Sequence, residues 1–420
     1  MLKNIFYAQS GGPTAVINTS ACGVIETARA HSDKIGKVLV GRNGIIGALK
    51  EELYDTTFES SEAIAALRYT PTANIFGTCR YKLKGLEENK EQYERLMEVF
   101  AAHNIGYFFY NGGGDSQDTA HKVSLLSQQM GYPLVCIGIP KTVDNDLSYT
   151  DTCPGFGSVA KYIAISTLEA GMDVKGMAAT STKVFIMEVM GRHSGWIAAA
   201  SGLASHDPSE PPHIILFPEI PFDEPAFLKR VDHCVKTYGY CVVIVSEGVR
   251  DKDNKFIAES DAKDAFGHAQ LGGVAPYIAD MIKQKLNYKN HWAVPDYLQR
   301  SARHIASKTD IEQAYALGKA AIDYALAGKG DVMLTIERIA AAPYQWRVGD
   351  VALQKVANVE RKMPRDFISQ NGYEITEKCR EYLQPLIQGE DYPPYQNGIP
   401  QYARLQNCLM PKKLETIFEV

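Results

Sequence analysis

Long apolar runs are missing from this chain. No stretch of its 420 residues approaches the roughly 20 apolar residues that a membrane-spanning helix needs, so we expect no membrane partner. The eight cysteines include no Cys-x-x-Cys pair, and residues 2–8 are too short for the apolar core of a secretory signal, which together favour the reducing cytoplasm. With a net charge of -5, the chain also lacks the basic excess of nucleic-acid-binding proteins, so we expect no nucleic-acid partner.

Three further signatures are absent or incomplete. The chain has no Gly-x-x-x-x-Gly-Lys-Ser/Thr run, which argues against a P-loop kinase. No spacing of His and Cys residues suggests zinc. Residues 155–160 read Gly-Phe-Gly-Ser-Val-Ala and fit a dinucleotide-binding fingerprint, but Asp-Thr-Cys-Pro precedes them in place of a strand. We therefore interpret residues 155–160 as a loop and the start of a helix.

The composition is that of a soluble globular protein, with 45% hydrophobic and 22% charged residues. Because the length exceeds what one hydrophobic core usually supports, we expect two domains, with a boundary near residues 152–157. Short β-rich runs alternate with helical patterns, which is typical of doubly wound α/β sheets with parallel strands. The expected strands are residues 4–8, 37–40, 106–110, 134–139, 183–189, 213–217, 240–245 and 331–336.

Two short motifs follow expected strands. Residues 112–116 read Gly-Gly-Gly-Asp-Ser, and residues 140–146 read Pro-Lys-Thr-Val-Asp-Asn-Asp. Parallel strands bring their carboxyl ends to one edge of a sheet, which is where α/β enzymes build their sites. Glycine backbone can approach phosphate oxygens closely, and the second motif places carboxylates beside an ammonium group. The pair of motifs therefore predicts phosphoryl transfer.

The two motifs resemble the paired signature of the phosphofructokinase family. ATP-using members of that family have Gly-Gly-Asp-Gly-Ser in the first motif and glycine at the position of Lys141, whereas pyrophosphate-using members have aspartate and lysine where this chain has Asp115 and Lys141. The resemblance covers most of residues 1–340. It implies two Rossmann-like doubly wound α/β/α domains with the active site in the cleft between them. Residues 1–152 plus about 298–340 would bind pyrophosphate, and about 153–297 plus 341–420 would bind the sugar phosphate.

The resemblance also implies which residues bind the phosphate donor. Residues 10–14 read Ser-Gly-Gly-Pro-Thr, follow a strand and open a helix, so backbone amides can hold a phosphate there, although a bare turn is the ordinary alternative. Residues 77–80 read Gly-Thr-Cys-Arg and match the family segment whose arginine reaches across the transferring phosphates; a lone arginine is more often a solvated surface residue. The predicted donor-binding residues are Gly11, Gly12, Arg80, Gly113, Gly114, Asp115 and Ser116.

The second motif carries the predicted catalytic residues. Transfer to a sugar hydroxyl needs a base for the hydroxyl proton, and Asp144 holds the family's position for it, with Asp146 orienting or assisting. Lys141 would lie near the charge that develops on the transferred group. An Asx turn that caps the next helix is the structural alternative. The first motif departs from the family at Gly114, where pyrophosphate enzymes usually have a second aspartate. Asp115 therefore remains as the predicted ligand of the Mg²⁺ cofactor, with pyrophosphate completing the shell.

The sugar-phosphate residues are implied in the same way. Met190, Gly191 and Arg192 follow one strand, with Arg192 also among the catalytic residues, and Glu247 follows another. Residues 297–300 read Tyr-Leu-Gln-Arg and match a family motif that binds the 6-phosphate. A similar run at residues 267–273 has Leu271 where the arginine is required, so we choose Tyr297 and Arg300 over His268. The complete predicted set is Thr142, Val143, Asp144, Lys183, Met190, Gly191, Arg192, Glu247, Tyr297 and Arg300.

The family resemblance implies reversible transfer of a phosphoryl group from pyrophosphate to the 1-hydroxyl of fructose 6-phosphate, in a cytoplasmic homodimer or homotetramer. Lys183 matches a position that reaches into a neighbouring subunit's site in related enzymes; a lysine at a strand edge is otherwise commonly a solubility device. Two alternatives stay open. One is an ATP-dependent phosphofructokinase, and the other is a non-catalytic regulatory paralogue that binds sugar phosphate only to modulate a partner.

Overall fold

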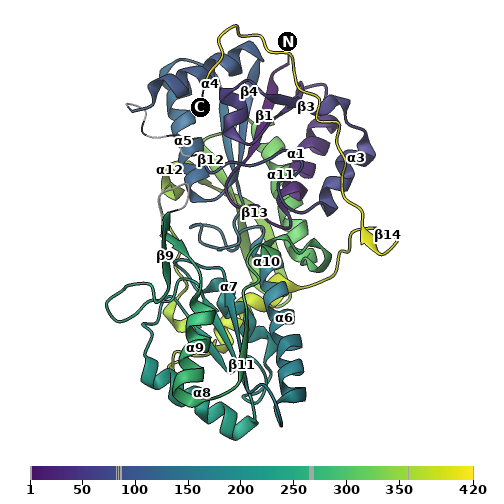
Figure 1. Ribbon diagram of the computed structural model, residues 1–420. Coiled ribbons are helices and arrows are strands. Elements are labelled where there is room, and N and C mark those ends of the chain that lie inside the picture. The colour runs from purple at the N-terminus through teal and green to yellow at the C-terminus, as the bar shows by residue number, and fades with distance from the viewer. Residues whose placement is uncertain are drawn as a thin grey trace. The chain divides into compact units, whose positions relative to one another are not determined.

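Strands from three parts of the sequence form a seven-stranded sheet with the order β13-β12-β5-β4-β1-β2-β3 in the computed structural model, which describes residues 2–81, 83, 85, 88–263, 269–357 and 359–419 (Figure 1). This sheet belongs to the first of two units, formed by Met1–Gly155, Lys308–Glu360 and Glu390–Val420. The second unit comprises Phe156–Ser307 and Arg361–Gly389.

The five central strands of unit 1 run parallel, and the two edge strands, β3 and β13, run antiparallel to their neighbours. The strands expected near residues 4–8, 37–40, 106–110, 134–139 and 331–336 are confirmed as members of this sheet. The strands are β1 (Asn4–Gln9), β2 (Val38–Gly41), β3 (Leu53–Asp55), β4 (Ile105–Gly112), β5 (Val135–Pro140), β12 (Val332–Ala341) and β13 (Tyr344–Ala352).

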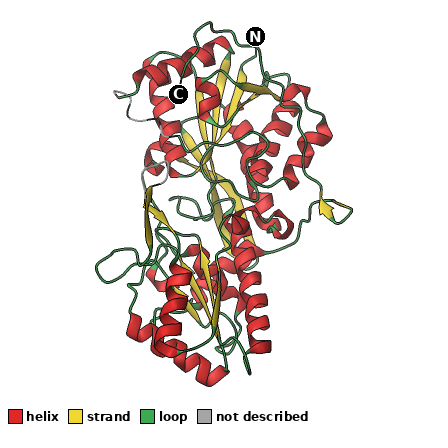
Figure 2. Ribbon diagram, viewed as in Figure 1, coloured by secondary structure: helices red, strands yellow, loops and turns green. Residues whose placement is uncertain are grey.

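Alternate residues of β1 enter two different cores, because successive side chains of a strand point to opposite faces of the sheet. Ile5 and Tyr7 pack in one core with residues of α1 and α11, whereas Phe6 and Ala8 pack in the other with residues of α2, α4 and α5. Helices therefore cover both faces of the sheet (Figure 2). The helices of unit 1 are α1 (Ile17–Ala30), α2 (Ile45–Leu49), α3 (Ser61–Ala65), α4 (Lys90–Ala102), α5 (Gly114–Gln129), α11 (Lys308–Leu326) and α12 (Leu353–Val356).

Unit 2 contains a four-stranded parallel sheet with the order β11-β6-β8-β7. The strands expected near residues 183–189, 213–217 and 240–245 are confirmed as β6 (Val184–Val189), β7 (Ile214–Leu216) and β8 (Cys241–Ser246), and β11 (Asn290–Ala293) adds an edge. A separate antiparallel pair joins β9 (Glu259–Lys263) and β10 (Ala269–Leu271). The helices are α6 (Phe156–Met177), α7 (Trp196–Ala200), α8 (Glu224–Tyr238), α9 (Val274–Leu286), α10 (Tyr297–Ser301) and α13 (Glu377–Leu383).

Local signals set the ends of the helices in unit 2. The Asp223 side chain accepts a hydrogen bond from the Ala226 N–H and caps the start of α8, and Gly239, with a left-handed φ of +87°, ends this helix. We expect residues 155–160 to form a loop and the start of a helix. This is confirmed, because α6 starts at Phe156. Within the described part of the chain, no helix combines the length and the apolar character needed to cross a membrane.

The C-terminal segment of unit 1 runs along the edge strand β3, after a small hairpin of β14 (Tyr395–Gln396) and β15 (Ile399–Pro400). The Asp55 N–H donates to Cys408 O at 2.9 Å and the Met410 N–H donates to Leu53 O at 2.8 Å, so the segment covers an edge that would otherwise present unpaired backbone groups.

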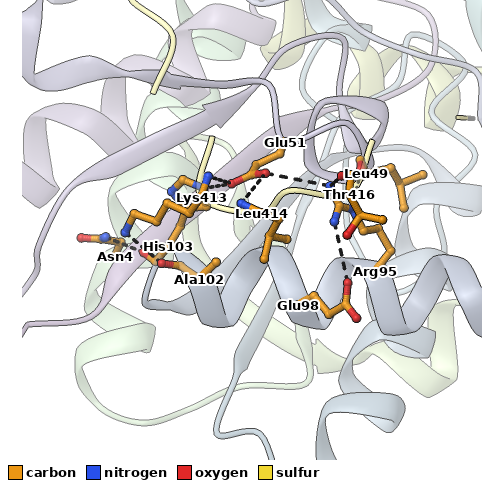
Figure 3. Close-up of polar contacts among 10 residues, drawn as sticks. All are labelled: Asn4, Leu49, Glu51, Arg95, Glu98, Ala102, His103, Lys413, Leu414 and Thr416. Atoms are coloured by element: carbon orange, nitrogen blue, oxygen red, sulfur yellow. Dashed lines mark hydrogen bonds and ion pairs between the residues drawn. The ribbon is translucent and has the colours of Figure 1, made fainter. Parts of the chain in front are cut away.

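A buried carboxylate anchors the end of the same segment. Glu51 accepts hydrogen bonds from the Lys413 and Leu414 N–H groups at 2.6 and 3.3 Å, and its Oε1 lies 2.7 Å from His103 Nε2 (Figure 3). Arg95 donates to the carbonyl of Thr416 at 3.1 Å. Burial by itself raises the pKa of Glu51, but the hydrogen bonds from the Lys413 backbone, His103 and the Leu414 backbone outweigh it, so the pKa lies below its ordinary value.

Candidate active site

Three of the predicted motifs lie side by side at one edge of the unit 1 sheet. They follow the carboxyl ends of β1, β4 and β5, which are neighbours in the order β5-β4-β1. Gln9 is paired with Asn111, and Gly112 is paired with Pro140, so the three strands end at the same level. The structure thus brings residues 10–14, 112–116 and 140–146 together, as the parallel-sheet rule predicts.

The Lys141 side chain forms hydrogen bonds with the first of these motifs, residues 10–14. Its ammonium group donates to the carbonyl oxygens of Ser10 at 2.6 Å and Gly12 at 2.7 Å, and the residue is only 3% exposed. Gly11, between the two carbonyls, has a φ of +75°, in the region that favours glycine. The lysine therefore places a positive charge beside the glycine backbone and also fixes the conformation of that backbone.

The segment before Arg80 packs against the same loop. The Gly11 N–H donates to Cys79 O at 3.0 Å, and Thr78 Oγ1 donates to Gly11 O at 2.9 Å. Arg80 follows directly, with an exposed side chain. The predicted donor-binding arginine thus lies next to the Gly11 loop, although 68 intervening positions separate Gly11 from Arg80 in the sequence.

The first turn of α5 carries the remaining predicted donor residues. Gly113 is the N-cap of this helix, and Asp115 lies half-buried in its first turn, where a carboxylate interacts favourably with the helix dipole. Ser116 is buried, with its N–H bonded to Gly113 O at 3.0 Å. A Cβ atom built on Gly114 would meet nothing within 4 Å, so the position that departs from the family pattern faces open space.

Burial controls the ionisation of two groups beneath these motifs. It raises the pKa of Tyr110 well above the usual 10.0, and the neighbouring Cys79 and Asp115 raise it further. Burial also raises the pKa of the Cys79 thiol. Both groups therefore stay neutral near pH 7, which leaves the charged chemistry of this edge to Lys141 and the aspartates.

The predicted base, Asp144, lies in a loop whose residues form hydrogen bonds with one another. The Asp144 N–H donates to Thr142 Oγ1 at 3.1 Å, and the Thr142 N–H donates to Pro154 O at 3.3 Å. Asp144 and Asp146 are both half-buried, whereas Val143 is 8% exposed. Asp144 and Asp146 are therefore less buried than Thr142, Val143 and Asn145 of the same loop, although the Oδ1 atom of Asp146 is shielded from solvent.

In unit 2 the structure brings together most of the predicted sugar-phosphate residues. Met190, Gly191 and Arg192 follow β6, and Glu247 follows the neighbouring strand β8. Glu247 Oε1 accepts a hydrogen bond from the Gly191 N–H at 3.2 Å, and Ser246 Oγ donates to Gly191 O at 2.5 Å. Gly191 has a φ of +132°, and a Cβ atom there would lie 2.7 Å from the carbonyl of Ser194, so only glycine fits.

The helix α10 adds Tyr297 and Arg300 to this half of the site. The Arg300 guanidinium lies 3.9 Å from the centroid of the Tyr297 ring, and Tyr297 is 62% exposed. Gln299, on the same short helix, is only 2% exposed, and its Oε1 accepts a hydrogen bond from the Met190 N–H at 3.2 Å. Of the competing run at residues 267–273, His268 lies outside the described residues.

Lys183 does not join the other predicted residues within one chain. It precedes β6, whereas Met190 follows this six-residue strand, so the two lie at opposite ends of it, roughly 20 Å apart. The Lys183 ammonium donates to the carbonyl of Ala178. A role for Lys183 in a neighbouring subunit's site stays a prediction.

Sequence reasoning missed two buried residues that hold these loops. Gln299 and Asn145 both lie inside motifs that were recognised, but they were assigned no role. For Gln299 a signal was present, because residues two positions from Tyr297 in a helix point to the opposite face. The backbone of Asn145 has a left-handed φ of +55°. This conformation could be suspected only from the general tolerance of asparagine for it.

Among the described residues, no three His, Cys, Asp or Glu side chains form a cluster that could hold a metal ion by themselves. Mg²⁺ keeps several waters and is usually held by one or two carboxylates together with substrate phosphates. The half-buried Asp115 beside the glycine motifs fits that mode of binding, in which the protein supplies only part of the coordination shell.

Comparisons with known proteins show which family this chain resembles. The sequence profile of a family described as Phosphofructokinase matches residues 4–325. The protein of Methylococcus capsulatus named pyrophosphate–fructose 6-phosphate 1-phosphotransferase is 64% identical over 418 residues, which cover 100% of this chain and 99% of the relative. A protein of the same name from Halomonas elongata is 63% identical, covering 98% of each. The crystal structure of the pyrophosphate-dependent phosphofructokinase of Marinobacter aquaeolei is 62% identical, with a TM-score of 0.92 over 100% of both chains.

Proposed function

The chain belongs to the phosphofructokinase family, and we propose that it transfers a phosphoryl group from pyrophosphate to the 1-hydroxyl of fructose 6-phosphate. The products are fructose 1,6-bisphosphate and orthophosphate. The names of the relatives in Methylococcus and Halomonas support this choice of donor and acceptor, as does their similarity to the chain along its whole length. We further propose that the reaction runs readily in both directions.

The observation that carries the proposal is the contact of Lys141 with the Gly11 loop. In the family resemblance, Asp115 and Lys141 are the residues that distinguish pyrophosphate-using from ATP-using members. The Lys141 ammonium lies at the backbone of Ser10 and Gly12, where a phosphate would bind, and Asp115 lies in the adjacent helix turn. A small dianionic donor suits this arrangement, while Asp115 repels the α-phosphate of a nucleotide.

The remaining donor contacts come from backbone and arginine. The amides of Gly12, Gly113 and Gly114 and the Ser116 hydroxyl offer hydrogen-bond donors, and the exposed Arg80 side chain binds the outer phosphate. Fructose 6-phosphate is bound by unit 2, where Arg300 and Tyr297 hold the 6-phosphate and Glu247 accepts hydrogen bonds from the sugar hydroxyls. Met190, Gly191, Arg192, Thr142 and Val143 complete the acceptor side.

These assignments define the proposed chemistry. The Asp144 carboxylate takes the proton of the 1-hydroxyl, and the hydroxyl oxygen attacks the nearer phosphorus of pyrophosphate in line. One new phosphorus–oxygen bond forms to the sugar, and the bridging bond breaks to release orthophosphate. Lys141 and Arg192 offset the negative charge that develops during transfer, and Asp146 orients the acceptor. Mg²⁺, when bound at Asp115 together with the donor, would neutralise phosphate charge.

A donor assay tests the proposal directly. Purified protein is supplied with fructose 6-phosphate and either pyrophosphate or ATP, and product is measured by a coupled assay of fructose 1,6-bisphosphate. We expect turnover with pyrophosphate and negligible turnover with ATP. Preference for ATP would establish the ATP-dependent enzyme, and no turnover with either donor, despite binding of fructose 6-phosphate, would establish a regulatory paralogue.

We also propose that the enzyme works in the reducing cytoplasm as a homodimer or homotetramer. All eight cysteines are free thiols, and seven of them are buried, which suits a compartment where disulfides do not form. The position of Lys183 supports assembly. Lys183 lies at the far end of β6 from Met190, so it would contribute to a site only if that site belonged to a second subunit.

A further inference from the structure

Asn145 lies between the two carboxylates of the second motif but differs from both in burial. It is 0% exposed, whereas Asp144 and Asp146 are half-buried. Its backbone has a φ of +55°, in the left-handed region. Its side-chain oxygen Oδ1 accepts a hydrogen bond from the N–H of Cys153 at 3.1 Å, and Cys153 is itself 0% exposed. Asn145 thus connects the beginning of this loop to its end.

Two such connections close the loop. Thr142 and Gly155 form an isolated β-bridge at its neck, and the Asn145 to Cys153 hydrogen bond lies inside that bridge. Gly155 is fixed in turn, because its N–H donates to Asp310 Oδ1 at 2.9 Å. Residues 143–146 belong to no helix or strand. The Asp144 backbone is therefore not held by a regular ladder, and the hydrogen bonds of this loop help to fix its position.

Asparagine meets two requirements at this position. It is one of the few residues besides glycine that adopt the left-handed conformation at little cost. Its amide also supplies a neutral acceptor for the N–H group of the buried Cys153. Glycine would satisfy only the backbone requirement, alanine would satisfy neither, and aspartate would bury a third carboxylate beside Asp144 and Asp146.

We propose that Asn145 is a positioning residue for phosphoryl transfer. It fixes the loop so that the Asp144 carboxyl stays within reach of the 1-hydroxyl whose proton it takes. This inference rests on the proposed function, since it requires Asp144 to act as the base. A displacement of a reacting group by about 1 Å can cost on the order of 10²-fold in rate, so one lost loop contact is sufficient to slow the chemistry.

Substitution at Asn145 therefore lowers kcat more than it weakens substrate binding. We expect Asn145→Ala to reduce kcat by roughly 10²-fold, and Asn145→Gly, which keeps the backbone conformation, by roughly tenfold. The apparent KM for pyrophosphate stays within about threefold of wild type, and that for fructose 6-phosphate rises by less than kcat falls, because Thr142 and Val143 belong to the same loop. The loss of kcat is similar in the reverse reaction, because the same carboxyl must then return the proton.

A matched control separates position from stability. Asn104 is another asparagine of unit 1 with a left-handed φ, +51°, and it precedes β4, at the opposite end of that strand from Gly112. Asn104→Ala imposes the same kind of backbone strain but leaves kcat unchanged. Thermal melting of all variants shows whether each is folded. If Asn145→Ala does not fold, the kcat of Asn145→Gly is the measurement that tests the proposal.

A double-mutant cycle provides the decisive measurement. If Asn145 acts only through Asp144, then Asp144→Asn combined with Asn145→Ala is no slower than Asp144→Asn alone. An additive loss in the double variant, or a normal kcat in Asn145→Ala when Asp144→Asn is nearly inactive, would overturn the role of Asn145 while the proposed function stands. Near-normal turnover of Asp144→Asn would overturn both the base assignment and this inference.

Discussion

Arg300 offers the most direct test of the sugar-phosphate half of the site. Its guanidinium stacks 3.9 Å from the centre of the Tyr297 ring on α10, which holds a long side chain in one orientation on an exposed helix. A planar guanidinium held in this way is suited to bind a phosphate through two parallel hydrogen bonds. We therefore predict that Arg300→Ala raises the apparent KM for fructose 6-phosphate.

The size of the effect follows from the kind of contact that is lost. A hydrogen bond to a charged group contributes about 1.5–3 kcal/mol, and about 1.4 kcal/mol corresponds to a factor of ten. The expected rise in KM is thus about 10- to 150-fold, with a paired contact near the upper end. Arg300→Lys keeps the charge but loses the planar fork and the stacking, so its KM should lie between those of wild type and Arg300→Ala.

Initial rates at saturating pyrophosphate give the KM, and a second stacked arginine provides the control. Arg250 also lies 3.9 Å from an aromatic ring, that of Phe256, and donates to Asn254 O within its own turn. Arg250→Ala removes an equivalent stack and one positive charge from unit 2, yet should leave the KM unchanged. An equal rise in both variants would mean that the effect is a general loss of positive charge.

The similar Gln-containing run at residues 267–273 defines the result that would refute the assignment of Arg300. If residues 267–273 bound the 6-phosphate, His268→Ala would raise the KM for fructose 6-phosphate and Arg300→Ala would not. That pattern would remove Tyr297 and Arg300 from the site. We expect the reverse.

Three further predictions concern the donor, the assembly and the fold. Asp115→Gly should admit ATP weakly, and adding Lys141→Gly should shift the kcat/KM ratio toward ATP by more than the single changes predict; an unchanged ratio would exclude these residues from donor choice. Mixing inactive variants altered at Lys183 and at Asp144 should restore activity after subunit exchange, unless each site is confined to one chain. Glu51→Ala should cost about 3–5 kcal/mol in urea unfolding at pH 7. Because folding lowers the Glu51 pKa, the part of this difference that comes from the lowered pKa is fully present above the ordinary pKa of about 4.3 and is lost as the pH falls through the lowered value.

The central strands were predictable because their burial on both faces leaves a readable pattern. Residues 105–110 and 134–139 form nearly continuous runs of apolar and aromatic residues, which is typical of a parallel strand between two layers of helices, and both are strands in the structure. Their carboxyl ends also located the motifs correctly relative to the sheet. Since adjacent parallel strands end together, the proximity of Gly112 and Lys141 followed from the sequence alone.

The edges of the sheets could not be predicted in the same way. β11 has the sequence Asn-His-Trp-Ala, with His291 and Trp292 exposed, and β3 has only three residues. An edge strand is defined by the backbone of its neighbour more than by its own side chains, so its pattern is weak. The course of the C-terminal segment depends on Glu51, more than 360 residues earlier in the sequence, and no local pattern records such a partner.

The candidate site was predicted as a set of motifs, but the contacts that hold the motifs were not. A buried polar side chain such as Gln299 or Asn145 looks the same in sequence as an exposed one. Only the fold shows that the Met190 N–H needs the first and the Cys153 N–H needs the second. The two residues therefore gained a role only when the burial and the partners of their amide groups were known.

The contacts of Lys141 change how the donor experiments must be interpreted. Because its ammonium bonds to Ser10 O and Gly12 O, Lys141→Gly removes a positive charge and at the same time releases the Gly11 loop, which also binds phosphate. A loss of pyrophosphate turnover in that variant therefore does not separate charge from loop order. Asp115→Gly leaves the Lys141 contacts in place, but it removes the proposed Mg²⁺ ligand and a first-turn carboxylate of α5 together with the repulsion of a nucleotide. Because loss of the metal ligand would slow transfer from either donor, donor repulsion in Asp115→Gly is measured by the ratio of kcat/KM for ATP to that for pyrophosphate and not by either rate alone. Any additional shift of this ratio on removing Lys141 measures the two roles of the lysine together.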